Sequence, residues 1–264
     1  LRWGQRMNEG NTIDMMVGAL TDPFEQIHMG ITAENIAAKW HIGREEQDQY
    51  AIESHRRAIH AIKNGHFKEQ ILPIEMIVRK NTIVFDTDEH PRENVDMAGL
   101  AKLRTVFQKQ GTVTAGNASG INDSAAALVL MERALAEKRG LQPMARLVSY
   151  GHAGVDPQLM GIGPIPAVHN ALQRAGLKVA DMDVIESNEA FAVQACVVAK
   201  ELKFDPEKTN PNGGAIALGH PIGATGAILA IKALYELQRI NGRYALVTMC
   251  IGGGQGIAAV FERL

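Results

Sequence analysis

Three side chains in the last third of the sequence combine residue types that do chemistry on acyl groups. Asn188 lies in ESNEAF, His220 in GHPIGATG and Cys250 in CIGGGQG. A cysteine thiolate can act as a nucleophile or a base, a histidine transfers protons, and an amide donates hydrogen bonds to a developing anion. The three residues together predict thiol chemistry, provided that the fold brings them together.

Cys250 ends a run of strand-forming residues and is followed almost at once by glycines. The run YALVTM, residues 244–249, predicts a strand, and we expect Gly252, Gly253, Gly254 and Gly256 to turn the chain with positive φ. Bare N–H groups in such a turn could form an oxyanion hole for a thioester oxygen. The alternative is a half-buried cysteine at a strand end that takes no part in chemistry.

His220 stands between Gly219 and Pro221, where we expect a helix over residues 221–239 to begin. A helix amino terminus disfavours the charged imidazole and favours a developing anion, so a neutral histidine is predicted. The alternative is a histidine that is merely satisfied in a tight, glycine-rich loop.

Asn188 falls between a predicted strand at 184–186 and a predicted helix at 189–202. The carboxyl end of a strand is where α/β proteins place ligands, which favours a functional side chain. Asparagine is also a good N-cap residue, and this second interpretation is compatible with the first.

Apolar periodicity predicts the other elements that must position these side chains. Predicted helices are 31–40, 44–65, 133–139 and 165–175, and predicted strands are 71–78, 82–85 and 145–151. The first 110 or so residues are charge-rich and are typical of a cap-like region, whereas strands alternate with helices in the second half of the chain. This alternation predicts a layered α/β architecture.

The composition excludes several classes of protein. The 264 residues are 46% hydrophobic and 21% charged with a formal net charge of -2, so we expect a soluble globular chain without a general attraction to nucleic acid or membranes. Two cysteines, Cys196 and Cys250, argue against a disulfide framework or a four-ligand metal site, and no run of about eighteen apolar residues occurs. A cytoplasmic location is expected. The chain begins LRWGQRMNEG, with neither Met nor a helix or strand signal, so we also expect that a segment precedes it.

Five stretches of the sequence resemble one enzyme family. NEAF (188–191), GHPIGATG (219–226) and CIGGGQG (250–256) resemble the thiolases; TAGNASGIND (114–123) and HMGITAEN (28–35) resemble more narrowly the bacterial acetyl-CoA acetyltransferases and β-ketothiolases. The resemblance covers essentially the whole chain. It implies reversible Claisen condensation of an acyl-CoA with acetyl-CoA and, in reverse, thiolysis of a 3-ketoacyl-CoA by CoA. No cofactor or metal is implied, because the CoA thioesters are substrates.

Thiolases use two cysteines, and the resemblance implies a role for one that is present here. Cys250 matches the acid/base that moves the α-proton, while His220 and a water oriented by Asn188 would hold the enolate oxygen. His220 would also activate the nucleophile, and the N–H of Gly252 would contribute to a second oxyanion hole. Cys196, in AFAVQACVVAKEL, lies outside the nucleophile motif. It is expected to fill the core, and the nucleophile is expected upstream of this chain.

The resemblance also locates a CoA site. Ser119 matches a serine that contacts pantetheine, and Arg92 matches an arginine that meets the adenine nucleotide. The other implied contacts are His28 and Met29 in the tunnel, Phe107 and Ala115 beside it, and Ala190 and Phe191 at the acyl end. The simple alternatives are a packed loop histidine for His28, an exposed loop charge for Arg92 and a helix cap for Ser119. Gly99 departs from the family, whose members often have a serine there near the nucleotide.

The fold implied by the resemblance is α/β with five layers, αβαβα, built from two similar halves. It places a loop domain involved in tetramer contacts at 1–116, the end of the first half at 117–144 and the second half at 145–264, in a homodimer or homotetramer. Two alternatives remain open: a non-catalytic acyl-CoA-binding protein, and a thiol hydrolase that uses Cys250 as its nucleophile. The order Asn, His, Cys is the reverse of the papain-like order, which convergent sites tolerate. A ketoacyl synthase is less expected, because that related family has a histidine where Cys250 stands.

Overall fold

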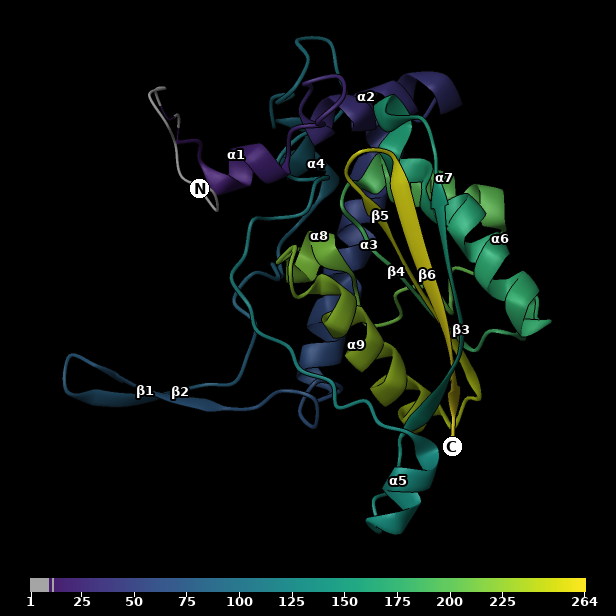
Figure 1. The fold of residues 1–264 in the computed structure, drawn as a ribbon. Helices are drawn as coiled ribbons and strands as arrows, with labels where there is room; N and C mark the ends of the chain where they lie inside the picture. Colours follow the sequence, from purple (N-terminus) through teal and green to yellow (C-terminus); the bar gives the residue numbers. More distant parts are fainter. Residues whose placement is uncertain (1–9, 11) are drawn as a thin grey trace.

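The computed structural model describes residue 10 and residues 12–264, and its centre is a four-stranded mixed sheet (Figure 1). The strands are β3 (Ala145–Gly154), β4 (Val184–Ser187), β5 (Tyr244–Ile251) and β6 (Gln255–Arg263), in the order β3-β6-β5-β4. β4 runs parallel to β5, and β6 is antiparallel to β5 and to β3. Ser187 is level with Thr248, so the residues that follow β4 and the end of β5 lie at the same edge of the sheet.

Helices cover both faces of this sheet. α6 (Pro164–Ala175) and α7 (Ala192–Leu202) pack on one face in an apolar cluster that includes Leu246. α9 (Thr225–Ile240) packs on the other face in a cluster that includes Val247. Successive residues of β5 thus enter opposite clusters, which is the period-two alternation of a strand that is buried on both sides.

Helices from the first half of the chain pack around α7 and the edge of the sheet where β5 ends. α2 (Met29–Trp40) contacts α7 and the short 3-10 segment η1 (Pro157–Ile162). α3 (Arg44–Lys63) contacts α7, α8 (Ala215–Leu218) and α4 (Met97–Ala101). An apolar cluster joins residues of α2, η1 and α7 to Cys250 at the end of β5. The remaining short elements are α1 (Met15–Ala19), α5 (Arg133–Lys138) and the 3-10 turn η2 (Val179–Asp181).

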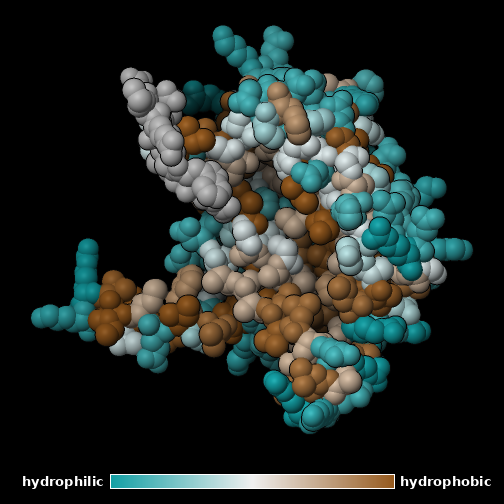
Figure 2. Space-filling model, in the orientation of Figure 1, coloured by the Kyte–Doolittle hydropathy of each residue, from teal (hydrophilic) through white to brown (hydrophobic). Residues whose placement is uncertain are grey.

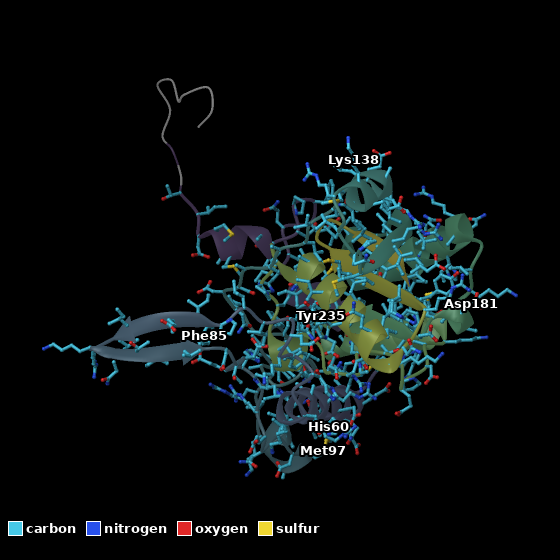
Figure 3. The ribbon with its side chains drawn as sticks, turned by 90° about the horizontal axis from the view of Figure 1, so that it is seen from below. His60, Phe85, Met97, Lys138, Asp181 and Tyr235 are labelled. Atoms are coloured by element: carbon cyan, nitrogen blue, oxygen red, sulfur yellow. The ribbon has the colours of Figure 1, made fainter. Side chains whose placement is uncertain are left out.

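A two-stranded hairpin projects from this body. β1 (Ile74–Val78) pairs with β2 (Asn81–Phe85) through a turn in which Arg79 and Lys80 both have positive φ, and every residue of the two strands is exposed. Seen from below, the hairpin extends to one side, while α5 with Lys138 and the region of His60 and Met97 lie at opposite ends of the body (Figure 3). A hairpin without a further partner is marginally stable in water, so this element is suited to packing against another surface.

The segment between the hairpin region and β3 also leaves apolar side chains exposed. Residues 119–132 form neither helix nor strand, and Leu128, Val129 and Leu130 are 39%, 87% and 76% exposed. Figure 2 shows apolar residues gathered along the hairpin and on the face between it and α5. The small residues of GTVTAGNASGINDSAAALVLM therefore do not pack closely along their whole length.

Most predicted helices and strands are confirmed, with three differences that affect the site. β6 was not predicted at all. α7 begins at Ala192 rather than at residue 189, and α9 begins at Thr225 rather than at residue 221. Before α7, distant groups bind the carboxylate of Glu189 and the carbonyl of Ala190. Before α9, residues 221–224 form a turn in which the carbonyl of Pro221 accepts the N–H groups of Ala224 and Thr225.

Candidate active site

Asn188 and His220 meet at the edge of the sheet. Asn188 follows β4, is almost completely buried, and its backbone N–H donates to the carbonyl of Thr248 on β5 at 2.9 Å. Its Nδ2 lies 3.4 Å from Nε2 of His220. Asn188 is not a helix N-cap, because α7 begins only after Phe191. Its Oδ1 is buried without a hydrogen-bond partner among the described residues, which suits a group that orients a water or a substrate.

His220 is held in a loop rather than at the first turn of a helix. Its backbone N–H donates to the carbonyl of Gly120 at 3.2 Å, and its Nδ1 lies 2.7 Å from Oγ1 of Thr225. Pro221 belongs to the turn before α9, where its carbonyl accepts the N–H groups of Ala224 and Thr225. Burial lowers the pKa of His220 below its ordinary value. A neutral imidazole results as predicted, but its cause is the loss of solvent and not the helix dipole.

Cys250 lies at the end of β5, opposite Gly256, and is 7% exposed. It packs in an apolar cluster with Met29 and Phe191, and burial raises the pKa of its thiol to about 12. The thiol is therefore protonated at neutral pH until a substrate or a base draws the proton away.

The glycines after Cys250 serve two different purposes. Only Gly253 and Gly254 have positive φ, so the expectation that Gly252 and Gly256 also turn the chain in this way is wrong. Any side chain at Gly256 would overlap the backbone of Gly163, so this glycine allows β6 to pack closely against the start of α6. A Cβ added at Gly252 would lie within ordinary contact distance of the Met29 thioether.

The residues expected at the acyl end of a CoA tunnel gather beside Cys250. The ring of His28 stacks on Phe107 at 4.8 Å between centroids, and Phe107 meets Phe191 edge-on at 6.3 Å. His28 precedes α2 as its N-cap, since its Nδ1 accepts the N–H of Gly30 at 3.0 Å, and it packs on Phe107, in agreement with the interpretation as a packed histidine. Met29, Ala190 and Phe191 are buried in the same apolar cluster, against which Phe107 packs.

Ser119 is tied directly to the NEAF segment. Its hydroxyl and its backbone N–H both donate to the carbonyl of Ala190, at 2.9 and 3.1 Å, and Ala118 forms a β-bridge with Phe191. The helix-cap interpretation of Ser119 is therefore wrong, because no helix begins there.

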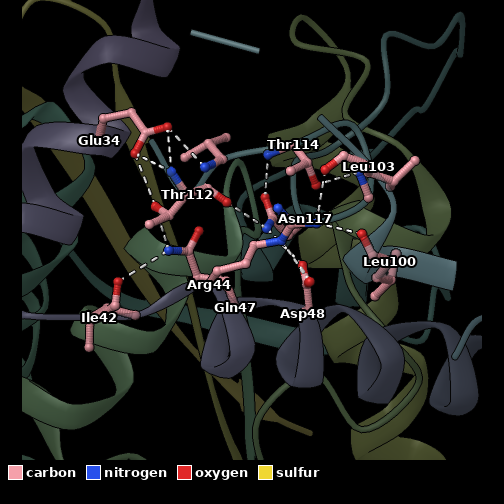
Figure 4. Close-up of polar contacts among 12 residues, drawn as sticks. Glu34, Ile42, Arg44, Gln47, Asp48, Leu100, Leu103, Thr112, Thr114 and Asn117 are labelled. Atoms are coloured by element: carbon pink, nitrogen blue, oxygen red, sulfur yellow. Dashed lines mark hydrogen bonds and ion pairs between the residues drawn. The ribbon is translucent and has the colours of Figure 1, made fainter. Parts of the chain in front are cut away.

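A buried polar network fixes the loop before Ser119 (Figure 4). The carboxylate of Glu34 accepts the N–H groups of Thr112 and Val113. The Nδ2 of Asn117 donates to Asp48 at 2.9 Å, and its Oδ1 accepts the N–H of Thr114 at 2.8 Å. Since α2 and α3 supply the two carboxylates, these helices determine where the loop presents Ser119.

Comparison with known proteins gives the family. Residues 1–134 match the family model of the thiolase N-terminal domain, and residues 141–263 match that of the thiolase C-terminal domain. The chain belongs to the thiolase family. It is 65% identical over 264 residues to a β-ketothiolase of Cupriavidus necator and 52% identical over 265 residues to an acetyl-CoA acetyltransferase of Rhizobium meliloti, covering all of this chain and 67% of each relative.

Solved structures confirm the thiolase fold. The acetyl-CoA acetyltransferase of Bacillus anthracis superposes with a TM-score of 0.93 at 48% identity, and human mitochondrial 3-ketoacyl-CoA thiolase with a TM-score of 0.90 at 42% identity. Each comparison covers all of this chain and 67% of the solved chain. The human enzyme has also been solved in complex with CoA, and this chain superposes on that complex with a TM-score of 0.88 at 43% identity, covering all of this chain and 66% of the solved chain.

The remaining residues expected at the thiolase CoA site lie outside this cluster of contacts. Arg92 is exposed, in agreement with the exposed-loop interpretation, and Ala115 is exposed in a turn. Gly99 belongs to α4, where its N–H is capped by Asp96 Oδ1 at 2.7 Å. Cys196 is buried in α7 within the core, and burial raises the pKa of its thiol to about 12. Among the described residues there is no group of three or more His, Cys, Asp or Glu placed to hold a metal ion. In that same part of the chain, no helix has the length and apolar character needed to cross a bilayer.

Sequence reasoning missed Glu189, the neighbour of Asn188. Its side chain is buried, and four groups donate to its carboxylate: the hydroxyls of Tyr50 and Ser54, Nδ2 of Asn210 and the backbone N–H of Ile216. These donors come from α3, α8 and the loop before α8, so one carboxylate holds the NEAF segment against three parts of the fold. The available signal was a carboxylate in ESNEAF between a predicted buried strand and a predicted apolar helix, because a buried charge must be paired or hydrogen-bonded.

We expect Glu189→Gln to lower the free energy of unfolding by about 2–3 kcal/mol, because the amide turns an NH2 group toward a donor that the carboxylate had satisfied. Urea unfolding at pH 7 measures the change. Glu137→Gln is the matched control: Glu137 is 60% exposed in a surface ion pair, so its loss should change stability by less than about 0.5 kcal/mol. Equal effects of the two substitutions would contradict the role of Glu189.

A buried histidine holds the Arg92 loop in a pH-dependent way. Nδ1 of His55 accepts the backbone N–H of Arg92 at 3.2 Å, and burial, followed by the charges of His90 and Arg92, lowers the pKa of His55 to about 4. The unfolded chain therefore binds a proton here between about pH 6.5 and pH 4 that the folded chain does not, so this contribution to stability is lost as the pH falls through that window. In His55→Asn, Oδ1 takes the place of Nδ1 and does not titrate. The quantity to measure is the free energy of unfolding of the wild type minus that of His55→Asn. We expect this difference to decrease as the pH is lowered from 7 to 4.

Proposed function

We propose that this chain carries the proton-transfer site of an acyl-CoA C-acyltransferase that catalyses condensation of acyl-CoA with acetyl-CoA and thiolysis of 3-ketoacyl-CoA. The observation that carries the proposal is the contact between Asn188 and His220 at the sheet edge where β5 delivers Cys250. The family assignment and the names of the relatives support it. We further propose that the enzyme acts in the cytoplasm, in fatty acid metabolism, without a cofactor.

In this mechanism Cys250 is the base that takes the α-proton of a bound acetyl group. Because its thiol has a pKa of about 12, Cys250 takes the α-proton only as a thiolate, so its own proton passes first to the CoA thiolate released in acyl transfer. In the direction of thiolysis its thiol returns the α-proton to the enolate carbon, and the thiolate left behind takes the proton of the incoming CoA thiol. The enolate oxygen is held by His220 and by a water on the free Oδ1 of Asn188. The N–H of Gly252 donates a hydrogen bond to the thioester oxygen of the second acyl group.

The acyl group itself is carried by a different cysteine. Cys196 is buried in α7 within the core, and Cys250 is needed as the base, so neither is assigned as the nucleophile. The chain spans about two thirds of the length of the relatives it matches. We place the nucleophile in a part of the enzyme outside these 264 residues.

CoA is proposed to enter past the loop that holds Ser119. The hydroxyl of Ser119 already donates to Ala190, which leaves its oxygen free to accept an N–H of pantetheine. His28 and Met29 are proposed to line the tunnel, with Phe107 and Ala115 beside it. Ala190 and Phe191 contact the acyl end, and the exposed Arg92 meets the nucleotide. The family assignment and the names of the relatives disfavour the competing idea, a hydrolase with Cys250 as nucleophile.

A thiolysis assay tests the proposal. The chain is assayed with acetoacetyl-CoA and CoA, alone and after being joined to the part of the C. necator relative that its alignment leaves out; the second protein is called the joined enzyme below. Activity of the joined enzyme only, together with acylation of a cysteine outside this chain, supports the proposal. An acyl group on Cys250, found by intact mass and peptide mapping, supports the hydrolase. Binding of CoA without turnover in both proteins supports a non-catalytic acyl-CoA-binding protein.

We also propose that the enzyme is a homotetramer in which the projecting hairpin packs against another copy. Residues opposite each other in the β1–β2 register share a face of the hairpin. One face carries Asn81 and five apolar side chains, which are Ile74, Met76, Val78, Ile83 and Phe85. These side chains are 40–54% exposed, and such a patch on a projecting element is typical of an interface.

Charges placed on that face should separate the copies. We expect Met76→Asp combined with Ile83→Asp to lower the molar mass of the joined enzyme, measured by light scattering, because an unpaired carboxylate is costly to bury. Thr82→Asp is the matched control, since Thr82 lies on the opposite face of the same hairpin. A mass that is unchanged in the double variant would exclude the hairpin as the interface.

A further inference from the structure

Thr225, the first residue of α9, is hydrogen-bonded to the imidazole of His220. It is 3% exposed, and its Oγ1 lies 2.7 Å from Nδ1 of His220 and 3.1 Å from the carbonyl oxygen of Pro221. The threonine side chain therefore bridges the ring and the turn that precedes the helix. None of the sequence motifs assigned a role to this hydroxyl.

The groups on either side of His220 determine which nitrogen carries the proton. Nε2 faces Nδ2 of Asn188, and an amide nitrogen can only donate, so Nε2 must be the nitrogen with the lone pair. Nδ1 then carries the hydrogen and donates it to Oγ1 of Thr225. A hydroxyl has one proton, and that of Thr225 is left to donate to the carbonyl of Pro221, which also accepts the N–H groups of Ala224 and Thr225. These assignments place every proton in the series of hydrogen bonds that runs from Asn188 through His220 and Thr225 to Pro221.

The geometry points to Thr225 as a positioning residue that keeps His220 in the Nδ1–H tautomer, with its Nε2 lone pair available as a base. A carboxylate holds the ring in the same way in serine-protease triads, whereas here a neutral hydroxyl backed by a carbonyl does so. The catalytic meaning rests on the proposed function. When Nε2 takes the proton of a nucleophilic thiol, the S–H bond breaks, the electron pair stays on sulfur, and a new N–H bond forms. The resulting imidazolium keeps its Nδ1–H on Thr225 and presents Nε2–H to an oxyanion.

Nitrogen NMR of the histidine side chains tests the tautomer directly. The full chain is labelled with ¹⁵N and studied at pH 8 without substrate, and the His220 resonances are identified by their loss in His220→Gln. We expect Nδ1 to resonate as a protonated nitrogen and Nε2 as an unprotonated one. In Thr225→Val, which has the same shape without a hydroxyl, the two resonances should move toward each other as both tautomers become populated. Thr225→Ser restores the hydroxyl and should restore the separation.

Two results would overturn the inference. The first is an Nε2–H pattern in the wild type, which would mean that the Asn188 amide is turned and that the Thr225 hydroxyl donates to Nδ1. The second is an unchanged tautomer in Thr225→Val. If Thr225→Val does not fold, as judged by its circular dichroism, Thr225→Ala and Thr225→Cys are measured in its place against Thr225→Ser. Because no turnover is involved, failure of the tautomer test is distinct from failure of the thiolysis assay.

Discussion

Replacing Cys250 by serine is expected to slow Claisen condensation by the joined enzyme about 10²- to 10⁴-fold, which is the usual contribution of a positioned general base. Acyl transfer from acyl-CoA to the enzyme should continue, because that step uses a different cysteine. A serine hydroxyl has nearly the volume of the thiol but loses a proton far less readily. Burial raises the pKa of the Cys250 thiol to about 12, which makes its thiolate a base strong enough for a weakly acidic α-carbon.

Condensation is measured as formation of acetoacetyl-CoA, and acyl transfer as the mass added to the intact protein. Cys196→Ala is the matched control, since it removes the other buried cysteine of this chain, which packs in the same apolar cluster as Cys250 but has no assigned step in the mechanism. It should leave both steps near the wild-type rate. Equal loss of both steps in Cys250→Ser would contradict the division of labour between the two cysteines.

His220→Ala should slow both steps, in contrast to Cys250→Ser. Without Nε2 the nucleophile loses its base, and condensation also loses a hydrogen bond to the enolate oxygen. The base contributes about 10²- to 10⁴-fold to acyl transfer. One oxyanion donor contributes about 10²- to 10³-fold to condensation, so acyl transfer should be affected at least as strongly as the condensation step.

Pre-steady-state measurement of acyl transfer and steady-state measurement of condensation separate the two contributions. His169→Ala serves as the control, because His169 is an exposed residue of α6. If acyl transfer in His220→Ala proceeded at the wild-type rate, His220 would serve the enolate alone and another base would have to activate the nucleophile.

Local patterns predicted much of the fold, because the elements that enclose the sheet have strong apolar periodicity. α6 and β3 each begin within one residue of the prediction. The starts of α7 and α9 were wrong for a reason that no local pattern contains. Glu189 is bound by Ser54, which is 135 residues away, and Pro221 lies in a turn tied to Gly120 through His220. Tertiary contacts of this kind override helix propensity at a site.

The three candidate residues could be identified from their types and motifs, but the causes of their properties could not. The neutrality of His220 comes from burial, and a sequence does not show which loops cover a side chain. The positioning residues Glu189 and Thr225 escaped notice because each fits an ordinary local interpretation, one as a helical residue and the other as part of a helix start. Glu189 is bound by residues far away in the sequence, and Thr225 by the loop just before it, so only the folded structure shows what their oxygens contact.

The contacts that assemble the site join residues far apart in the chain: Ser119 with Ala190, 71 residues apart, Thr112 with Glu34, 78 apart, and Ser54 with Glu189, 135 apart. Contacts of such long range form late when a chain folds, because a large loop must close before any of them is gained. A partly folded chain therefore has the strand and the cysteine without the pocket. Proton transfer by Cys250 should begin only when the last of these loops has closed and has brought Asn188 and His220 into contact.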